Sequence, residues 1–353
     1  MTKTALIYTP KYLEHDPGPD HVESASRLKV IMRELKKSGL LERKEISLLE
    51  PKPADLKEIK LVHDPEYVQT VKRFCESGGG LLDIGDTVVS PKSFEAAVLA
   101  AGGTIDAADL VMSGKFENAF ALVRPPGHHA GPYYALGFCI FNNVAVAAVH
   151  LIHRFNLKRI LILDIDAHHG NGTQEIFYTT KKVLYISLHQ DPHGFPGTGF
   201  IDETGEGEGL GYTVNVPFPF RVDDKIYLRA LNRIVTPIAE QYKPQFILVS
   251  VGFDVHHTDP VAGLSLSTFG CLEAFGKAMD LASRFCEGKL VAVLEGGYNL
   301  VLLGKLVTAT VAQMAGIPYR LKDQPPVAIP RVRKRAEKIM EEVKRVHSAF
   351  WNL

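Results

Sequence analysis

The segment ILILDIDAHHGNGT, residues 160–173, joins an apolar run to acidic and imidazole side chains. Asp164, Asp166 and His168 stand at every second position, and His169 comes directly after them. Because side chains of a strand alternate between its two faces, the first three are expected to point roughly the same way. Two buried carboxylates on one face repel each other and lose their hydration unless a cation lies between them. The spacing therefore predicts a metal site at the end of a buried strand.

A third ligand is expected from Asp254, in ILVSVGFDVHHTDP, which follows another apolar run. Gly252, just before it, permits a tight exit from that strand. Together, Asp166, His168 and Asp254 would give a tetrahedral ion two carboxylate ligands and one imidazole ligand. One position would stay open for water, which is typical of a catalytic rather than a structural zinc site. The alternative at this stage is that Asp166 and Asp254 cap the helices that follow their strands.

Two adjacent histidines, His128 and His129, follow the apolar run NAFALV, within VRPPGHHAGPYYALGFCIFNN. Pro125, Pro126 and Gly127 predict a stiff turn before them. Adjacent side chains project in different directions, so we do not expect both to bind one ion. Histidine titrates near neutral pH, so one is expected to be a general base and the other an electrostatic or acid partner. The simpler alternative is a histidine pair on a surface loop.

A tyrosine follows a glycine pair in AVLEGGYNL, residues 292–300, where an apolar run ends in Glu295, Gly296, Gly297 and Tyr298. Its hydroxyl can reach a site beyond the strand and donate to an oxygen that develops negative charge. The alternative is that the ring packs as an aromatic plug with its hydroxyl in water.

The composition is that of an ordinary globular protein, with 353 residues, 46% hydrophobic and 23% charged. The 40 basic and 40 acidic residues cancel, so charge gives no sign of nucleic-acid or membrane-surface binding. The four cysteines are far apart and form no CxxC pair, which suits a reducing compartment. No apolar run reaches about 18 residues and no signal peptide is evident. We therefore expect a cytoplasmic protein that binds neither membranes nor nucleic acid directly.

Strand and helix patterns alternate along the chain. Short β-branched and aliphatic runs predict strands at residues 4–8, 118–123, 159–166, 182–188, 211–216, 245–252 and 289–297. Helices are expected between them, at residues 25–37, 93–112, 142–155, 223–242, 267–285 and 300–314. The alternation predicts an α/β fold with a doubly wound parallel sheet, whose ligands bind beyond the carboxyl ends of the strands. The stretches NGT, 171–173, and FPGTG, 195–199, are turn signals.

No shift in composition divides the chain before about residue 320. The stretch KDQPPVAIP then predicts an extended connector, and a charged amphipathic helix follows from about residue 331 to 350. We expect one large domain over residues 1–320 and a C-terminal segment, 321–353, whose helix packs on that domain or on a partner. A homo-oligomer is left open.

Seven motifs resemble those of the histone deacetylase superfamily and stand in the same order: RPPGHHA, GFCIFNNVAVAA, DIDAHHGNGTQEIF, SLHQDPHGFPGTG, VNVPF, GFDVHHTDP and LEGGYN. That group includes acetoin-utilisation-type proteins and acetylpolyamine amidohydrolases. The early segment HDPGPDHVESASRL is similar to the family's opening stretch, so the resemblance covers about residues 5–315. It implies that residues 1–320 are a deacetylase catalytic domain of the arginase/deacetylase fold. Its central sheet would be mostly parallel, with about eight strands flanked by helices.

The resemblance also implies a role for each site residue. Asp166, His168 and Asp254 match the zinc ligands. His129 matches the general base, and His128 matches its electrostatic neighbour, which Asp164 orients. Tyr298 matches the residue that polarises the acyl carbonyl. The walls of an acyl-lysine tunnel are implied by these matches: Phe138 and Phe195, with Gly137 beneath them and Gly297 beside Tyr298.

A structural monovalent cation, K⁺, is implied as well. Its ligands would be the side-chain carboxylate of Asp164 and the hydroxyl of Ser187. Main-chain oxygens of Asp166, His168 and Leu188 would complete the set.

Two positions refine the expected subtype. Asn171 stands where some branches have an aspartate partner for the second histidine, so the chain resembles the class II side of the family. An amide stabilises imidazolium less than a carboxylate does, so His129 should be readily neutral at pH 7. Val261 stands where polyamine-specific members can carry an acid, which weakens the polyamine interpretation.

The expected activity is zinc-dependent hydrolysis of the amide of an acyl-lysine-bearing protein or peptide. The alternative is an amidohydrolase for acetylpolyamine or another small acylated amine. A two-manganese site of the arginase type is disfavoured, because DAHHG offers Gly170 where that site needs an aspartate. A binding protein that has lost the chemistry is the alternative from another class.

Overall fold

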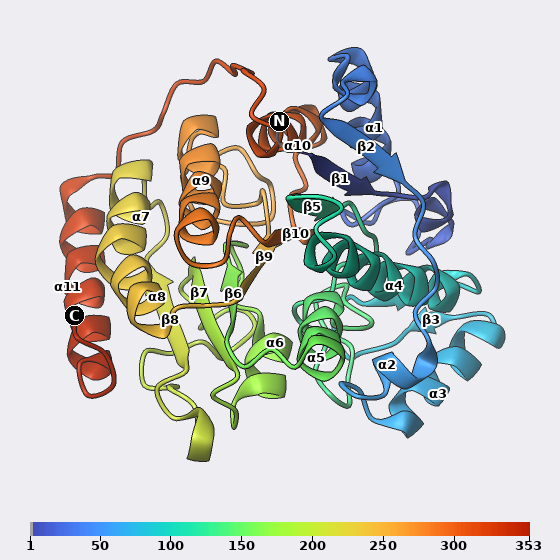
Figure 1. Cartoon of the computed structure of the whole chain (residues 1–353), viewed down its shortest axis with the longest axis horizontal. Helices are drawn as coiled ribbons and strands as arrows, with labels where there is room; N and C mark the ends of the chain where they lie inside the picture. The colour runs from blue at the N-terminus through green and yellow to red at the C-terminus, as the bar shows by residue number, and fades with distance from the viewer. Residues whose placement is uncertain (1–2) are drawn as a thin grey trace.

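The computed structural model describes residues 3–353, and its centre is a sheet of eight strands (Figure 1). The strand order is β2-β1-β5-β10-β9-β6-β7-β8, and all neighbouring pairs are parallel. The expected α/β fold with a mostly parallel sheet is confirmed. The strand bounds are β1 Thr4–Ile7, β2 Ile46–Leu49, β5 Asn118–Ala121, β6 Ile160–Asp164, β7 Val183–Gln190, β8 Thr213–Phe218, β9 Phe246–Val251 and β10 Leu290–Leu294.

Helices cover both faces of the sheet (Figure 1). One layer contains α1 Ser26–Lys37, α7 Asp224–Ala230, α8 Thr236–Tyr242, α9 Thr268–Phe285 and α10 Leu300–Met314. The other contains α4 Ser93–Met112, α5 Asn143–Phe155 and α6 Asn171–Phe177, with α2 Leu56–Ile59 and α3 Pro65–Glu76 packed outside them. A short antiparallel pair, β3 Gly80–Leu81 and β4 Val88–Val89, lies apart from the sheet.

The inner strands are apolar without alternation because both of their faces are covered. Every residue of β5, β6, β9 and β10 is buried. In the edge strand β2 only the first residue, Ile46, is buried, and this strand was not predicted from the sequence.

The NGT stretch was predicted to be a turn, but in the structure it forms the first turn of α6. The Thr173 backbone N donates to the carbonyl oxygen of His128 at 3.2 Å. A Cβ on Gly172 would lie 2.1 Å from the carbonyl oxygen of Ala130. The small residues therefore serve close packing of α6 on the histidine loop, a tertiary reason that turn propensity does not reveal.

The helix predicted over residues 223–242 is interrupted by one π turn, Leu231–Val235, between α7 and α8. Pro237 has no backbone N–H to donate into the preceding turn, which favours a local change in pitch. The Leu231 carbonyl oxygen accepts from the Thr236 backbone N and also from the Thr236 hydroxyl, at 3.0 Å.

The C-terminal segment ends in a helix, α11 Pro330–His347, that lies against β8 and α7 of the same chain (Figure 1). Its buried face contains Ala336, Met340, Val343 and His347. The Trp351 Nε1 donates to the carbonyl oxygen of Gly211 at 2.8 Å. The connector before α11 has no regular secondary structure. The division at residue 320 stays a prediction.

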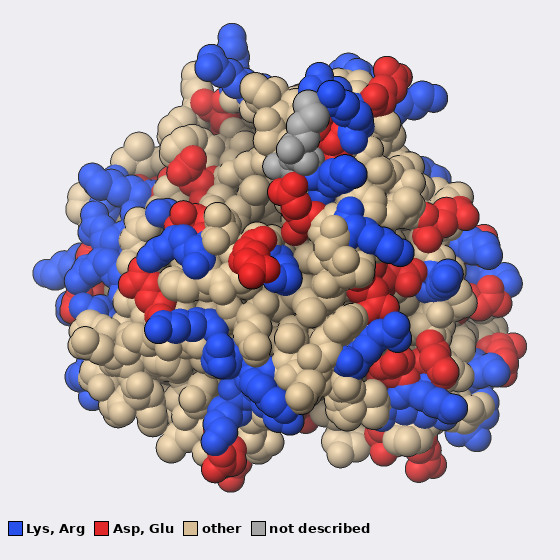
Figure 2. Space-filling view, viewed as in Figure 1, with Lys and Arg blue, Asp and Glu red and all other residues tan. Residues whose placement is uncertain are grey.

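The surface carries both signs of charge. Figure 2 shows Lys and Arg side chains interspersed with Asp and Glu over one face. Among the helices of residues 3–353, none combines the length and the apolar character needed to cross a bilayer.

Candidate active site

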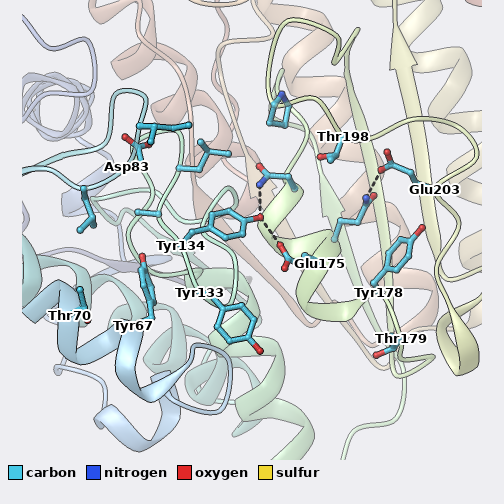
Figure 3. Close-up of a pocket in the computed structure, with 17 residues that line it drawn as sticks. Tyr67, Thr70, Asp83, Tyr133, Tyr134, Glu175, Tyr178, Thr179, Thr198 and Glu203 are labelled. Carbon is cyan, nitrogen blue, oxygen red and sulfur yellow. Dashed lines mark hydrogen bonds between the residues drawn. The ribbon is translucent and has the colours of Figure 1, made fainter.

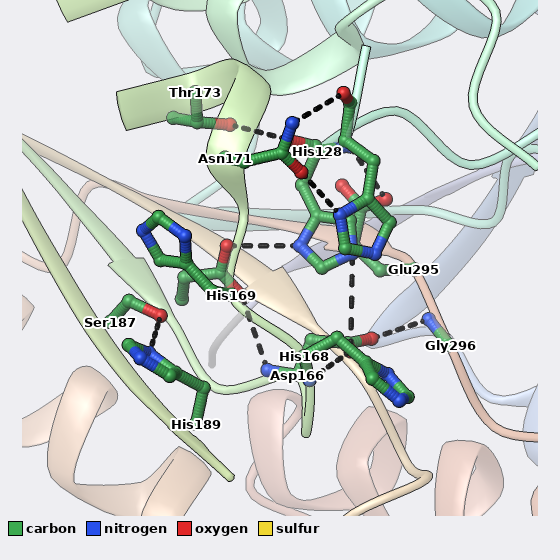
Figure 4. Close-up of polar contacts among 12 residues, drawn as sticks. His128, Asp166, His168, His169, Asn171, Thr173, Ser187, His189, Glu295 and Gly296 are labelled. Carbon is green, nitrogen blue, oxygen red and sulfur yellow. Dashed lines mark hydrogen bonds and ion pairs between the residues drawn. The ribbon is translucent and has the colours of Figure 1, made fainter. Parts of the chain in front are cut away.

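The carboxyl ends of β5, β10, β9 and β6, four neighbouring strands, carry the predicted chemical residues to one place. A cavity of about 330 Å³ opens there. Its lining consists of Asp86, Pro126, His128, His129, Gly137, Phe138, Cys139, Asp166, His168, Gln190, Asp191, Gly194, Phe195, Phe220, Val261 and Tyr298. Figure 4 shows the polar contacts around the histidines and Asp166. The parallel sheet thus brings together motifs that are far apart in sequence.

Asp166, His168 and Asp254 form the candidate metal site. One ligand atom from each lies within 4.8 Å of the other two, and all three residues are buried. Nδ1 of His168 is 2.9 Å from Oδ2 of Asp254 and 3.3 Å from Oδ1 of Asp166. Among residues 3–353, no hydrogen-bond donor satisfies Oδ2 of Asp254. A buried, unsatisfied carboxylate oxygen beside an imidazole nitrogen fits a divalent cation.

The backbone holds the two carboxylates without closing the site. The Gly296 backbone N donates to Oδ2 of Asp166 at 2.8 Å, and the Ala167 backbone N donates to Oδ1 of Asp254 at 3.0 Å. A Cβ on Gly252 would lie 2.1 Å from Oδ2 of Asp166. Burial and the neighbouring Asp166 carboxylate raise the pKa of Asp254 to about 7. Bringing the two acids together in charged form therefore needs a compensating cation.

The strand alternation that was predicted to align Asp164, Asp166 and His168 holds only in part. β6 ends at Asp164, so regular alternation does not continue to Asp166 and His168. A bent segment places them, with the His168 backbone N donating to Oδ1 of Asp166 at 2.9 Å. Gly170 leaves no room for a further acid, because a Cβ there would lie 2.3 Å from Oδ2 of Asp164.

The two adjacent histidines have different partners. His128 places Nδ1 3.0 Å from Oδ2 of Asp164, whereas His129 places Nδ1 2.8 Å from Oδ1 of Asn171. Their ring centroids are 4.0 Å apart. Burial opposes charge on His128, but the carboxylates around it, Asp164 foremost, raise its pKa to about 10. Burial and the positive charge of His128 lower the pKa of His129 well below its ordinary value. The surroundings therefore favour imidazolium at His128 and neutral imidazole at His129.

Tyr298 lies at the cavity wall on a fixed loop. Its backbone N donates to Oδ2 of Asp259 at 2.7 Å, and the Arg27 guanidinium lies 4.9 Å from the centroid of its ring. Burial raises the pKa of the phenol well above its ordinary value, so the hydroxyl keeps its proton to donate. Gly297 does not line the cavity; its carbonyl oxygen accepts from Nε of Arg27 at 2.8 Å.

The expected tunnel residues lie around the same cavity. Phe138 and Phe195 line it, and the Phe195 ring centroid is 4.9 Å from that of His129. A Cβ on Gly137 would lie 2.5 Å from Cδ2 of His129 and 2.9 Å from Cζ of Phe195. Val261 is also in the lining and is 37% exposed at the rim. Only glycine at position 137 permits this close approach of the imidazole to the aromatic wall.

Two of the residues predicted to bind the monovalent cation, Asp164 and Ser187, lie on the neighbouring strands β6 and β7. Asp164 and Ser187 are partners in the register of β6 and β7. The Asp164 carboxyl is wholly buried, and burial raises its pKa. The Ser187 hydroxyl is 2.8 Å from Nδ1 of His189 (Figure 4), and the Leu188 carbonyl oxygen is 3.3 Å from the Tyr227 hydroxyl. Carboxylate, hydroxyl and main-chain oxygens are the kinds of ligand that hard cations prefer, and the cation site itself stays a prediction.

Sequence reasoning did not assign three supporting residues. Glu295 accepts from the backbone N of Gly127 at 2.7 Å and so fixes the histidine loop; its burial raises its pKa to about 7. Asp259 and Arg27 hold the tyrosine loop. Glu295 and Asp259 lie within recognised motifs, but nothing in their spacing reveals a backbone partner. Arg27 is 270 positions from the glycine it contacts.

A second, larger hollow has a volume of about 1020 Å³, and Figure 3 shows the residues that line it. Asn171 lines it, and its Nδ2 donates to the Tyr134 hydroxyl at 3.1 Å. The Tyr134 hydroxyl in turn donates to Oε2 of Glu175 at 2.6 Å. Figure 3 shows this chain of hydrogen bonds, which ends on the residue that orients His129.

Comparisons with known proteins give one consistent result. Residues 21–314 match the family model described as "Histone deacetylase domain". A protein named "Probable deacetylase" from Archaeoglobus fulgidus is 43% identical over 99% of this chain and 98% of its own length. The "Histone deacetylase-like amidohydrolase" of Pseudomonas aeruginosa is 38% identical over 86% of this chain and 79% of its own. The crystal structure of the HDA15 HD domain superposes with a TM-score of 0.89 at 36% identity, covering 99% of this chain and 95% of that one.

Proposed function

Since this chain belongs to the histone deacetylase family, we propose that it is a zinc-dependent enzyme that hydrolyses the amide of acyl-lysine-bearing proteins or peptides. The observation that carries this proposal is the shared cavity. His129, Tyr298 and the Asp166–His168 pair all line it, and Asp254 completes the buried ligand set. The metal ligands, a base and an oxyanion donor would therefore all face the acyl carbonyl of one bound substrate.

We infer that Asp166, His168 and Asp254 hold Zn²⁺. The ion supplies Lewis acidity, which lowers the pKa of a bound water and polarises the acyl carbonyl. Two carboxylates and one imidazole leave a coordination position free for these roles.

The chain's own residues then move the protons. Nδ1–H of His129 faces the Asn171 amide oxygen, which leaves Nε2 unprotonated. This Nε2 takes a proton from the water as its oxygen bonds to the acyl carbon, and the Tyr298 hydroxyl donates to the oxyanion that develops. When the carbon–nitrogen bond breaks, the protonated His129 gives its proton to the departing amine. The products are a carboxylic acid and the free amine.

His128 plays an electrostatic part in this scheme. Its imidazolium, held by Asp164, lies beside the ring of His129 and opposes a second lasting positive charge there. Phe138 and Phe195 would enclose the aliphatic arm of the substrate. Gly297 would act on the substrate only through the loop that presents Tyr298.

Further features of the proposal follow from the family. We infer a structural K⁺ at Asp164, Ser187 and the nearby main-chain oxygens of Asp166, His168 and Leu188. Asn171 favours a class II-like enzyme. The four cysteines are free thiols, which supports a reducing compartment such as the cytoplasm.

A small acylated amine is the second candidate substrate. The carboxylates of Asp86 and Asp191 line the cavity and would accept an ammonium group of such a substrate, whereas Val261 offers it no charge. A panel of acetyl-lysine peptides, free acetyl-lysine and acetylputrescine ranked by kcat/KM would distinguish the two classes.

The direct test is turnover of a fluorogenic acetyl-lysine peptide. We expect activity that a chelator abolishes and zinc restores, and activity that Asp254→Asn removes. No turnover of any member of the panel by zinc-loaded protein would indicate a binding protein instead. Turnover that is indifferent to chelators would contradict the zinc site, and two catalytic ions per chain would favour a ureohydrolase-like enzyme.

A further inference from the structure

A second trio of metal-ligating side chains lies outside the cavity. His256 and His257 follow β9, and Asp323 belongs to the connector that precedes α11. One ligand atom from each lies within 4.8 Å of the other two. Nε2 of His256 is 3.0 Å from Oδ2 of Asp323, and Nε2 of His257 is 3.4 Å from Oδ1 of the same carboxylate. Both imidazoles therefore direct the same ring nitrogen to one acid.

The trio is held in place by its surroundings. The Thr268 backbone N donates to Oδ2 of Asp323 at 2.9 Å, and the Gln324 backbone N donates to Oδ1 at 2.7 Å. These bonds fix the plane of the carboxylate and leave each oxygen a lone pair for the imidazole side. His256 is buried, whereas His257 and Asp323 are partly open to solvent. A cation can therefore enter from the surface, and a fourth ligand can be water.

The other nitrogen of His256 fits the same arrangement. Its Nδ1 is 3.0 Å from the Thr258 hydroxyl oxygen, which also accepts from Nδ2 of Asn299 at 2.8 Å. The Thr258 backbone N also donates to this Nδ1 at 3.2 Å, while Nε2 faces Asp323. Contacts of this kind at the second nitrogen orient the ring of a ligating histidine.

We propose that His256, His257 and Asp323 form a second Zn²⁺ site, separate from the Asp166, His168 and Asp254 set. Two imidazoles and one carboxylate are donors that suit zinc rather than Mg²⁺ or Ca²⁺, which prefer oxygen ligands. Bound zinc would fasten the connector to the loop that follows β9. The site would thus act as a structural tie between the C-terminal segment and the domain, whatever reaction the cavity performs.

Zinc stoichiometry of the full-length chain tests this directly. The protein is stripped with a chelator, titrated with ZnSO₄ by calorimetry, and analysed for metal after desalting. We expect two zinc ions per chain for the parent and one for Asp323→Asn or His257→Ala. Asp254→Asn should also hold one, and combining it with Asp323→Asn should leave none. His153→Ala, which removes an exposed histidine on α5, is the matched control and should keep both ions.

Proteolysis gives a readout that does not depend on activity. Zinc should slow tryptic cleavage after Arg320 and Lys322 in the parent and in Asp254→Asn, but not in Asp323→Asn. A single zinc ion in the parent, or an unchanged count in both Asp323→Asn and His257→Ala, would overturn the proposal and leave hydrogen-bonded ion pairs as the explanation. Loss of one zinc in His153→Ala would overturn it too, because binding would then be non-specific. Turnover of the acetyl-lysine peptide by Asp323→Asn reports separately on the catalytic site.

Discussion

At the scale of single residues, the two adjacent histidines differ in the partner that each faces. His128 faces a carboxylate of Asp164, whereas His129 faces the amide of Asn171. The carboxylate stabilises imidazolium by charge, and the amide offers only a dipole. The two partners thus favour different protonation states, which is the arrangement that the proposed pair of base and fixed cation requires.

Replacing the Asn171 amide by a carboxylate should raise the pKa of His129, the proposed base. In the parent the pKa of His129 lies well below 6.5, so the base stays unprotonated and kcat/KM should hold as pH falls below 6.5. In Asn171→Asp the added charge favours imidazolium, so the acid limb should move up by about 1 pH unit or more. A pH profile of kcat/KM measures this, and an acid limb that does not move would contradict the assignment of His129.

Removing the hydroxyl of Tyr298 should remove oxyanion stabilisation. Tyr298→Phe keeps the ring, its contact with Phe138 and the backbone bonds of its loop, so the fold should not change. We expect kcat to fall on the order of 10²-fold, as for other oxyanion donors. Single-turnover kinetics with the fluorogenic peptide measure the step. A rate equal to that of the parent would instead indicate an aromatic plug.

Tyr134 should act on the reaction through Asn171 without touching the substrate. Its hydroxyl joins Glu175 to the Asn171 amide, and so fixes which amide atom faces His129. Tyr134→Phe should lower kcat by about 5-fold, the equivalent of one hydrogen bond of about 1 kcal/mol, with little change in KM. Tyr133→Phe is the matched control, because Tyr133 is 68% exposed in the same hollow. Equal effects of the two variants would argue against a positioning role.

At the scale of elements, hydrophobic runs and their ends were readable because local chemistry determines them. The helices expected at 93–112 and 300–314 have these bounds in the structure. The strand β2 was missed because its apolar run is short and half exposed. The helix α3 was missed although Asp64 accepts from the backbone N of Glu66 at its start and Pro65 follows, which is a recognisable start signal.

The part of the candidate site that could be predicted consists of residues that come directly after strands. Asp166 and Asp254 follow apolar runs, and strand ends of a parallel sheet gather at one edge. The contacts made by Glu295, Asp259 and Arg27 were not predictable, because they depend on which loops become neighbours in space. No local pattern encodes that.

The exit of β9 should tolerate no side chain at Gly252. A Cβ there would lie 2.1 Å from Oδ2 of Asp166, so Gly252→Ala must displace the carboxylate or the strand end. We expect loss of one zinc ion per chain while the far-ultraviolet circular dichroism stays that of the parent. Gly85→Ala is the control, because its Cβ would approach no atom closer than 3.5 Å and Gly85 lies outside the site. Full zinc binding by Gly252→Ala would contradict the metal-site geometry.

At the scale of the whole molecule, a buried charge cluster joins the N-terminal segment to the site. The Glu23 carboxylate accepts from Nε of Arg124 at 2.8 Å and from Nη1 of Arg27 at 3.1 Å, and all three side chains are buried. Arg124 also donates to the His15 carbonyl oxygen at 2.6 Å. Because an unpaired buried charge is costly, the cluster fixes the strand β5 exit and the tyrosine loop in one geometry.

The C-terminal helix should contribute to the stability of the same cooperative unit. Met340 is wholly buried where α11 lies against β8 and α7, so its truncation leaves a cavity in a continuous core. Met340→Ala should lower the free energy of unfolding by about 2–5 kcal/mol in urea denaturation. Lys338→Ala, on the exposed side of the same helix, should change it by less than about 0.5 kcal/mol. If α11 were an independent appendage held by a partner, Met340→Ala would leave the main unfolding transition of the isolated chain unchanged. The buried face of α11 against β8 therefore predicts one transition for residues 1–320 and 321–353 together.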